Sequence, residues 1–203
     1  MDMKRLLFIL ICSLVFCASY SQGLGEPLKK DITQFMGIPI DGSVSLMTNR
    51  LKDKGFIPFD EGLFGLFNGE NVVINMNEYK GKVWRVFVVF PLMDSYSVKS
   101  KYNTLSQEFQ SKSNYIKIEN EATYYINNNI NLSYSINIEN KRFVANFLQL
   151  GKDVNYNNLS EIELKKHLSK KLIWFYISDE GDNQYRIVLY YENLYNYSNG
   201  EDL

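Results

Sequence analysis

Short polar connections between apolar strands constrain the fold of this chain more than any other feature. The alternating segment 71–77 and the strongly apolar segment 83–90 are separated by little more than the turn sequence YKGK. Segments 172–178 and 185–192 are separated by little more than DEGDN. A crossover between parallel strands needs about a dozen residues or more. These connections therefore predict antiparallel hairpins.

The residue pattern within the strands predicts which faces are buried. In the most apolar strand, Trp84, Val86 and Val88 alternate with other residues and so share one face. Arg85 interrupts the opposite face, which indicates a central strand with one buried side and one partly wet side. The predicted strands are 63–67, 71–77, 83–90, 122–126, 132–138, 142–148, 172–178 and 185–192.

Three segments carry the apolar spacing of amphipathic helices. Asp41 or Ser43 is expected to cap the first helix, because a short side-chain oxygen can accept a free backbone N–H there. Since the Asp41 carboxylate already occupies the position that favours negative charge, the turn IPIDGS is not expected to bind an anion. Asp94 is the expected cap of the second helix. The helices are predicted at 43–54, 95–112 and 159–171.

Helices that alternate with hairpins predict the α+β class, with an antiparallel sheet and helices packed on one of its faces. The order of helices and strands also raises the hypothesis of an internal α-β-β-β repeat. Its units would be residues 35–93, 94–150 and 151–195.

The start of the chain has the order of a secretory signal peptide. Lys4 and Arg5 form a basic start, residues 6–17 are apolar, and a cleavage point is expected between Ser21 and Gln22. A permanent membrane helix needs about 20 apolar residues, so we expect an exported chain, periplasmic or extracellular, whose mature form has no transmembrane span. The expected organisation is a signal peptide over 1–21, a lead-in segment over 22–34, a single α+β domain over 35–195 and a flexible tail over 196–203.

Both cysteines, Cys12 and Cys17, lie inside this leader. The mature chain would therefore contain no disulfide, thiol nucleophile or thiolate metal site. Lipid attachment at Cys17 is an alternative to simple cleavage, although the preceding Phe16 is larger than the small residue typical of such sites.

The charge composition argues against a nucleic-acid partner. The chain has 22 Lys and Arg against 23 Asp and Glu, a net charge of −1. Binding to a phosphate backbone calls for a basic surface, which this composition does not indicate. The sequence also has no phosphate-binding loop and no dinucleotide fingerprint, so no cofactor is expected.

Residues that could bind a metal lack the spacing that metal sites require. The single histidine, His167, lies in the third predicted helix without a Cys or second His beside it, and we interpret it as a solvent-facing residue. An acidic turn near the end of the chain does not match the calcium-binding loop. A hairpin turn explains the same composition. Its residues are Asp179, Glu180, Asp182 and Asn183.

Catalytic constellations are equally weak, so we predict no enzyme activity. There is no G-x-S-x-G motif, and one histidine offers little from which to build a Ser-His pair. Two acidic pairs, Asp60 with Glu61 and Glu119 with Glu121, could be proposed as glycosidase carboxylates, but nothing places either pair across a cleft. An unrecognised hydrolase is retained as an alternative.

Three N-glycosylation sequons occur in the chain. They matter only on a eukaryotic secretory route. Their asparagines are Asn131, Asn158 and Asn196.

The segment GIPIDGSVSLMTNRLKDKGF, followed by FGLFNGENVVINMNEYKGKVWRVFVVF, resembles short exported bacterial proteins of uncharacterised function. In these, a Gly-Ile-Pro turn starts a helix that ends at Gly-Phe before a hairpin. The helix-then-hairpin order is also similar to the beta-lactamase-inhibitor-protein-like fold and to small outer-membrane assembly lipoproteins. This resemblance implies protein–protein binding, often through an exposed sheet face.

These observations favour an exported, non-catalytic protein that binds a protein or cell-envelope component through an exposed sheet face. Residues expected on such a face are Ser133, Ser135 and Asn137. The alternative is a carbohydrate-binding module that uses tyrosines as stacking platforms, because aromatic rings offer a π-face. The candidate tyrosines are Tyr190, Tyr191, Tyr195 and Tyr197.

Overall fold

The computed structural model describes residues 32–118, 122–151, 160, 162 and 170–197. The predicted signal peptide, nearly all of the lead-in segment and almost all of the third predicted helix lie outside these residues.

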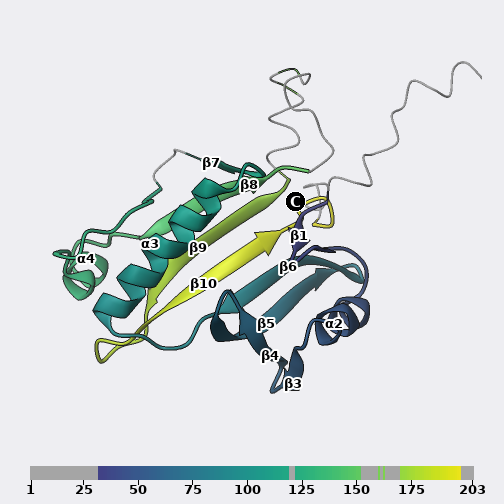
Figure 1. Ribbon diagram of the computed structural model, residues 1–203, viewed down its shortest axis with the longest axis horizontal. Coiled ribbons are helices and arrows are strands. Elements are labelled where there is room, and N and C mark those ends of the chain that lie inside the picture. Colours follow the sequence, from purple (N-terminus) through teal and green to yellow (C-terminus); the bar gives the residue numbers. More distant parts are fainter. Residues whose placement is uncertain (1–31, 119–121, 152–159, 161, 163–169, 198–203) are drawn as a thin grey trace, which may run out of the picture. The chain divides into compact units, whose positions relative to one another are not determined.

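An eight-stranded antiparallel sheet organises the described residues (Figure 1). Its strand order is β3-β4-β5-β6-β10-β9-β8-β7, so the last of the described strands lies in the middle of the sheet. A separate short hairpin, β1 with β2, precedes it. The strands are β1 (Gln34–Phe35), β2 (Ile38–Pro39), β3 (Ile57–Phe59), β4 (Gly62–Phe67), β5 (Glu70–Tyr79), β6 (Lys82–Val89), β7 (Tyr115–Lys117), β8 (Val144–Gln149), β9 (Leu172–Asp179) and β10 (Tyr185–Glu192).

Two-residue turns join β4 to β5 and β5 to β6, as the connection lengths predict. Asn68-Gly69 and Lys80-Gly81 all have φ between +49° and +79°. Left-handed backbone at both turn positions matches the right-handed twist of the flanking strands. The α+β class with an antiparallel sheet is therefore confirmed.

Three helices are described: α2 (Val44–Lys52), α3 (Ser95–Ser111) and α4 (Leu132–Asn137). Of the two caps proposed for α2, the structure has Ser43, whose Oγ accepts a hydrogen bond from Leu46 N at 3.3 Å. Asp94 caps α3 by accepting from the backbone N–H groups of Tyr96 and Ser97. A short oxygen acceptor thus satisfies free donors at each start, and both helix predictions are confirmed.

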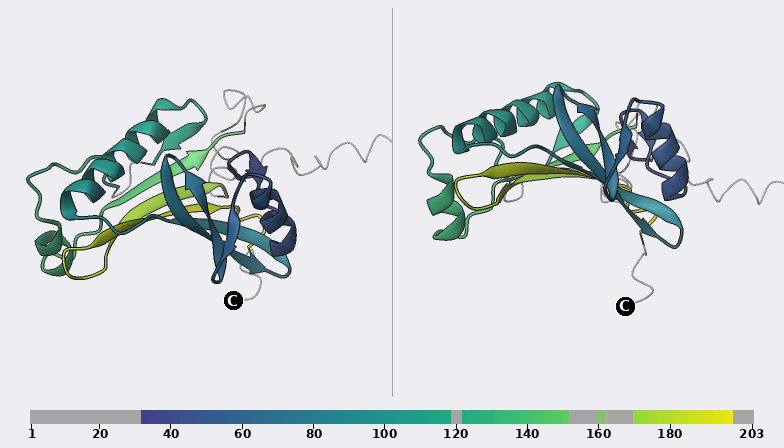
Figure 2. Two further views of the ribbon diagram at one scale, coloured as in Figure 1. Left: turned by 60° about the horizontal axis from the view of Figure 1, so that its bottom comes forward. Right: turned by 90° about the horizontal axis from the view of Figure 1, so that it is seen from below.

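The core lies between α3 and one face of the sheet (Figure 2). Phe109 of α3 stacks on Phe147 and Phe175, with ring centroids 5.0 and 6.0 Å apart. Met47 and Leu51 of α2 are buried in the same core. The helices therefore leave the opposite face of the sheet, here called the open face, without cover from α2 or α3.

The strand predicted at 132–138 is wrong, because these residues form α4. Asn131 caps the helix by accepting from Tyr134 N at 3.1 Å. The helical turn buries Leu132 and Ser135 and exposes Tyr134, whereas a strand would have placed Leu132 and Tyr134 on the same face. The alternation of apolar residues here coincides with a helical spacing.

The strand predicted at 122–126 is also wrong. Its backbone bonds instead to side chains of α3: the Asn103 carboxamide both donates to Ile126 O and accepts from Ile126 N. The Lys99 ammonium, buried on α3, donates to two carbonyls of the following loop. After α3, therefore, the chain forms β7, α4 and β8, and the middle unit of the hypothesised repeat lacks its three consecutive strands.

Candidate functional site

A continuous row of apolar side chains crosses the open face. Residues directly opposite one another in neighbouring strands point to the same face of the sheet. The pairing of the strands therefore puts all residues of this row on the open face. Seven strands contribute one residue each, and every neighbouring pair is in register. From β3 to β8 this apolar row is Ile57, Phe64, Val73, Val89, Val188, Tyr176 and Val144.

Beside this row, the open face carries a stack of aromatic rings. Phe87, Tyr190 and Trp174 are direct partners across β6, β10 and β9. Trp174 and Tyr190 are nearly parallel with centroids 4.2 Å apart, and Phe87 lies 5.7 Å from Tyr190. Tyr176 extends the stack at 5.8 Å from Trp174. The Tyr190 ring therefore contacts a ring on each side, from β6 and from β9.

A buried carboxylate joins the same strands. Glu192 Oε1 accepts from Arg85 Nε at 2.9 Å and from Trp174 Nε1 at 3.0 Å, and it lies 2.7 Å from Arg85 Nη2. The Arg85 guanidinium also lies over the rings of Trp84 and Tyr190, at 4.1 and 5.0 Å. Charge-assisted hydrogen bonds and cation–π contacts of this kind fix the aromatic rings in place.

The strand pattern predicts Trp84 on the buried face of β6, but the structure places it outside the core. Asn77 pairs with Arg85 and Glu78 pairs with Val83, so Trp84 is the additional residue of a β-bulge. Val83 is fully buried instead. The bulge turns the Trp84 ring toward Tyr197, whose centroid is 4.4 Å away.

Burial changes the ionisation of Tyr190. Desolvation raises the pKa of Tyr190 to about 12, with nearby Tyr176 adding to the shift and Arg85 opposing it. The Tyr190 hydroxyl therefore remains protonated at neutral pH, so this ring adds no charge beside the Arg85–Glu192 ion pair.

The open face is hollowed at its β3–β4 end. A cavity of about 660 Å³ is lined by residues that include Phe59, Val73 and Phe87. Asp60 and Glu61, one of the acidic pairs singled out in the sequence, form the turn between β3 and β4 and lie at its rim, exposed to solvent. The apolar row and the aromatic stack both reach this cavity, through Val73 and Phe87.

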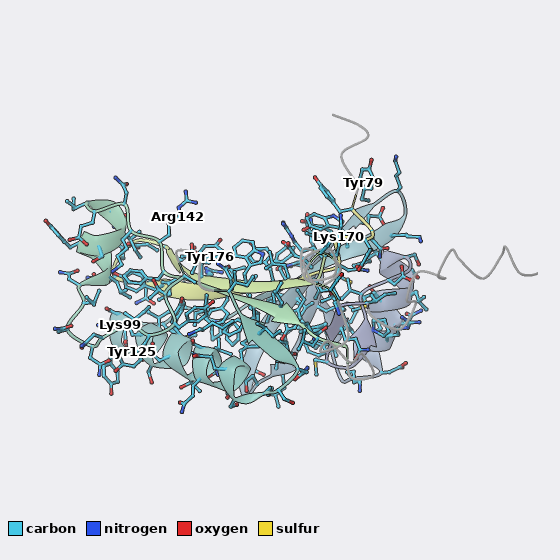
Figure 3. The ribbon with its side chains drawn as sticks, turned by 90° about the horizontal axis from the view of Figure 1, so that it is seen from above. Tyr79, Lys99, Tyr125, Arg142, Lys170 and Tyr176 are labelled. Carbon is cyan, nitrogen blue, oxygen red and sulfur yellow. The ribbon has the colours of Figure 1, made fainter. Side chains whose placement is uncertain are left out.

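The structure does not place the predicted sheet-face residues on the sheet. Ser133, Ser135 and Asn137 belong to α4, and Asn137 Nδ2 donates to Asp179 Oδ2 at the β9–β10 hairpin. Figure 3 shows Tyr176 and Tyr79 on the side of the sheet opposite α3, whereas Lys99 and Tyr125 lie on the α3 side.

The four candidate tyrosines separate into three environments. Tyr190 lies in the aromatic stack, and Tyr191, on the other face of β10, is buried in the core. Tyr195 and Tyr197 are exposed near the chain end, with the Tyr197 ring between Trp84 and Tyr79. The prediction of Tyr191 as a stacking platform is wrong, since the alternation of β10 directs it inward.

The acidic turn at 179–183 is a hairpin turn, as its composition predicts. Gly181, Asp182 and Asn183 all have positive φ, and Gly181 N donates to Asp179 Oδ1. Across the described residues, no three His, Cys, Asp or Glu side chains come together as a metal-binding group. His167, Glu119, Glu121 and Asn158 lie outside the described residues.

One sequence signal could have located the open face. Phe87 and Val89, and likewise Trp174 and Tyr176, are large apolar residues on the faces opposite the buried positions of their strands. A strand that is apolar on both faces indicates cover on both sides. The charged residue Arg85 in the same strand predicts a partly solvated face instead.

No protein-family model matches this sequence, and neither a curated protein nor a solved structure matches it. None of the helices among the described residues has the length and apolar character needed to cross a membrane.

Proposed function

We propose that this protein is an exported, non-catalytic binding protein that recognises a protein or cell-envelope component through the open face. The observation that carries the proposal is the apolar row that crosses seven strands opposite α3. An antiparallel sheet with helices on one face ordinarily presents polar residues to water on the other. A large apolar surface on a soluble domain is typical of an interaction site.

The composition of the open face also supports protein recognition. Binding interfaces are enriched in Tyr, Trp, Phe and Arg, which give large contact area at low cost in conformational entropy. Trp174, Tyr176, Tyr190, Phe87 and Arg85 meet on this face. Their mutual contacts hold the rings in fixed positions, so a partner would find the surface already ordered.

The ring geometry makes carbohydrate stacking less favoured. A sugar needs a free aromatic face, whereas the Tyr190 ring contacts Trp174 and Phe87 and the Tyr197 ring contacts Trp84 and Tyr79. The hydrolase alternative has little support, because Asp60 and Glu61 are adjacent turn residues exposed at a cavity rim.

Charge substitutions on the apolar row test the proposal. Val73→Arg and Val144→Arg place a guanidinium on half-buried positions of the open face. We expect each to abolish retention, by the immobilised protein, of a partner from an envelope extract of the source organism. Photo-crosslinking from position 176 should identify the same partner.

Matched controls come from exposed apolar residues on the helices. Leu46→Arg and Tyr96→Arg add the same charge away from the open face, and we expect both to retain the partner. Equal retention by all four correctly folded variants, equal loss in all four, or no partner retained by the wild-type chain would contradict the proposal.

A further inference from the structure

A second cavity, of about 400 Å³, lies on the other side of the sheet from the open face. It is lined by residues of β1, the end of β4, the C-terminal half of α3, β7 and β10. Phe67, Leu105, Phe109, Tyr115 and Tyr191 supply its apolar walls. A volume of this size lies toward the small end of the range for ligand-binding pockets, about 300 to 1,000 Å³.

The walls of this cavity are held by contacts with the core. Phe109 meets Tyr115 edge-on at 4.9 Å and lies 6.4 Å from Tyr191. The Gln149 side chain, also at the cavity, accepts from Gln34 N and donates to Gln34 O and to the Tyr115 hydroxyl. Because Gln149 ties β1 to β8, the cavity is built by tertiary structure and not by one loop.

One polar group in the walls has no partner among the residues that the structure describes. Tyr191 is only 5% exposed, yet its hydroxyl makes no hydrogen bond to any residue that the structure describes. Another buried phenol of this core, that of Tyr102, is satisfied, since its hydroxyl donates to Thr123 O. A hydroxyl that lines a cavity and has no protein partner can donate to water or to a ligand that enters the cavity.

The Tyr191 hydroxyl is also a donor at neutral pH. Burial holds the pKa of Tyr191 well above its ordinary value, and the neighbouring Tyr115 and Glu108 raise it further. Both neighbours line the cavity together with Tyr191. Glu108 and Lys112, of opposite charge, are both at the cavity, which gives the lining no net preference for an ion.

We propose that this cavity binds a small neutral aromatic molecule that accepts a hydrogen bond from the Tyr191 hydroxyl. Aromatic walls match the ring, and the unpartnered hydroxyl matches a polar substituent. The site is independent of partner binding on the open face, because Tyr191 and Tyr190 point to opposite faces of β10.

Two probes of nearly equal shape test the hydrogen bond directly. p-Cresol carries a phenolic oxygen, whereas toluene has the same ring and methyl group without it. We expect p-cresol to shift the methyl NMR signals of Met36 and Leu105, both at the cavity, in a saturable manner. It should bind the full-length chain about fivefold more tightly than toluene does, as one net hydrogen bond implies.

Adjacent tyrosines supply the matched variants. Tyr191→Phe keeps the ring contacts and removes the hydroxyl, so it should bind the two probes equally. Tyr190→Phe makes the same change on the open face and should keep the fivefold preference. Absence of saturable shifts with p-cresol, equal affinity of the wild-type chain for both probes, or a preference that survives in Tyr191→Phe would overturn the proposal.

Discussion

Glu192 shows how the open face accommodates a charge within an apolar surface. Glu192 is only 4% exposed. One of its carboxylate oxygens accepts hydrogen bonds from both the Arg85 guanidinium and the Trp174 indole. The backbone carbonyl of Glu192 also accepts from Thr33 Oγ1 at 2.7 Å. A carboxylate is tolerated at such depth only when its oxygens are paired, so this residue depends on its partners.

Removal of Arg85 should therefore destabilise the fold. Arg85→Leu leaves the Glu192 carboxylate with the indole as its only described side-chain donor. We expect a loss of about 3 kcal/mol in the free energy of unfolding, at the lower end for a broken buried pair because 27% of the Arg85 side chain is exposed. Urea unfolding at neutral pH measures the change.

The partly exposed pair of Arg186 with Glu180, 3.1 Å apart, supplies the control. Arg186→Leu should cost less than about 1 kcal/mol, as solvent-screened pairs do. Similar losses in the two variants would contradict a special role for the buried pair.

Tyr190 predicts an alkaline dependence of stability. Its pKa is about 12 in the folded protein against 10.0 for an ordinary tyrosine. The folded state thus keeps a proton that the unfolded state loses, and the corresponding stability is complete below pH 10 and declines as the pH rises toward 12. Urea unfolding at pH 9, 10 and 11 should show this decline.

Tyr190→Phe should make the decline shallower without removing it, because burial also raises the pKa of Tyr102, Tyr185 and Tyr191. Tyr125, which is 68% exposed, provides the comparison. Tyr125→Phe should leave the slope unchanged, and an equal effect of both substitutions would refute the assignment.

Among the elements, those with a strong periodic pattern and an identifiable cap were predictable. α2 and α3 combine an apolar stripe with Ser43 or Asp94 at the start, and the hairpins carry Asn-Gly or Lys-Gly at the turn. α4 was not predictable, because a segment of six residues is too short to distinguish the strand period from the helix period. Tertiary contacts then determine which structure forms. β3 and β7 escaped prediction for a related reason: edge strands of three residues carry almost no pattern.

Since α4 is short, its cap should matter. Asn131→Ala removes the side-chain acceptor of Tyr134 N, and we expect a loss of about 1 kcal/mol in unfolding free energy. Amide hydrogen exchange should accelerate within 132–137. Asn129→Ala, in the same loop but outside the helix, is the control, and faster exchange in both variants would count against a capping role.

At the scale of the whole molecule, the sequence predicted neighbouring strands but not the complete sheet. Hairpin signals relate strands that follow one another, so β4-β5-β6 and β9-β10 were accessible. The pairing of β6 with β10 carries no such signal, because its partners, such as Val89 and Val188, are far apart in the chain. Without that junction the apolar row could not be assembled from sequence, and the open face went unrecognised.

The junction predicts that the sheet unfolds as one unit. The two tryptophans of the chain, Trp84 on β6 and Trp174 on β9, lie on either side of β10. Trp84→Phe and Trp174→Phe each leave one fluorescent reporter, and in each variant the urea midpoint from fluorescence should equal that from far-UV circular dichroism.

Trp174→Phe removes the indole hydrogen bond to Glu192. We expect this loss to lower the fluorescence midpoint and the circular dichroism midpoint of that variant equally. If either reporter changed at a lower urea concentration than the circular dichroism signal, the two sides of the sheet would unfold separately.

The central position of β10 also determines when the protein can fold. β6 and β9 have no strand between them until Tyr185–Glu192 is available, although both are made earlier. A growing chain therefore carries two unpaired strand edges until Tyr185–Glu192 has been synthesised. Such edges pair readily with other chains. Nascent or truncated copies that end before Tyr185 should thus be the species that aggregates, and delayed folding is a direct result of this strand order.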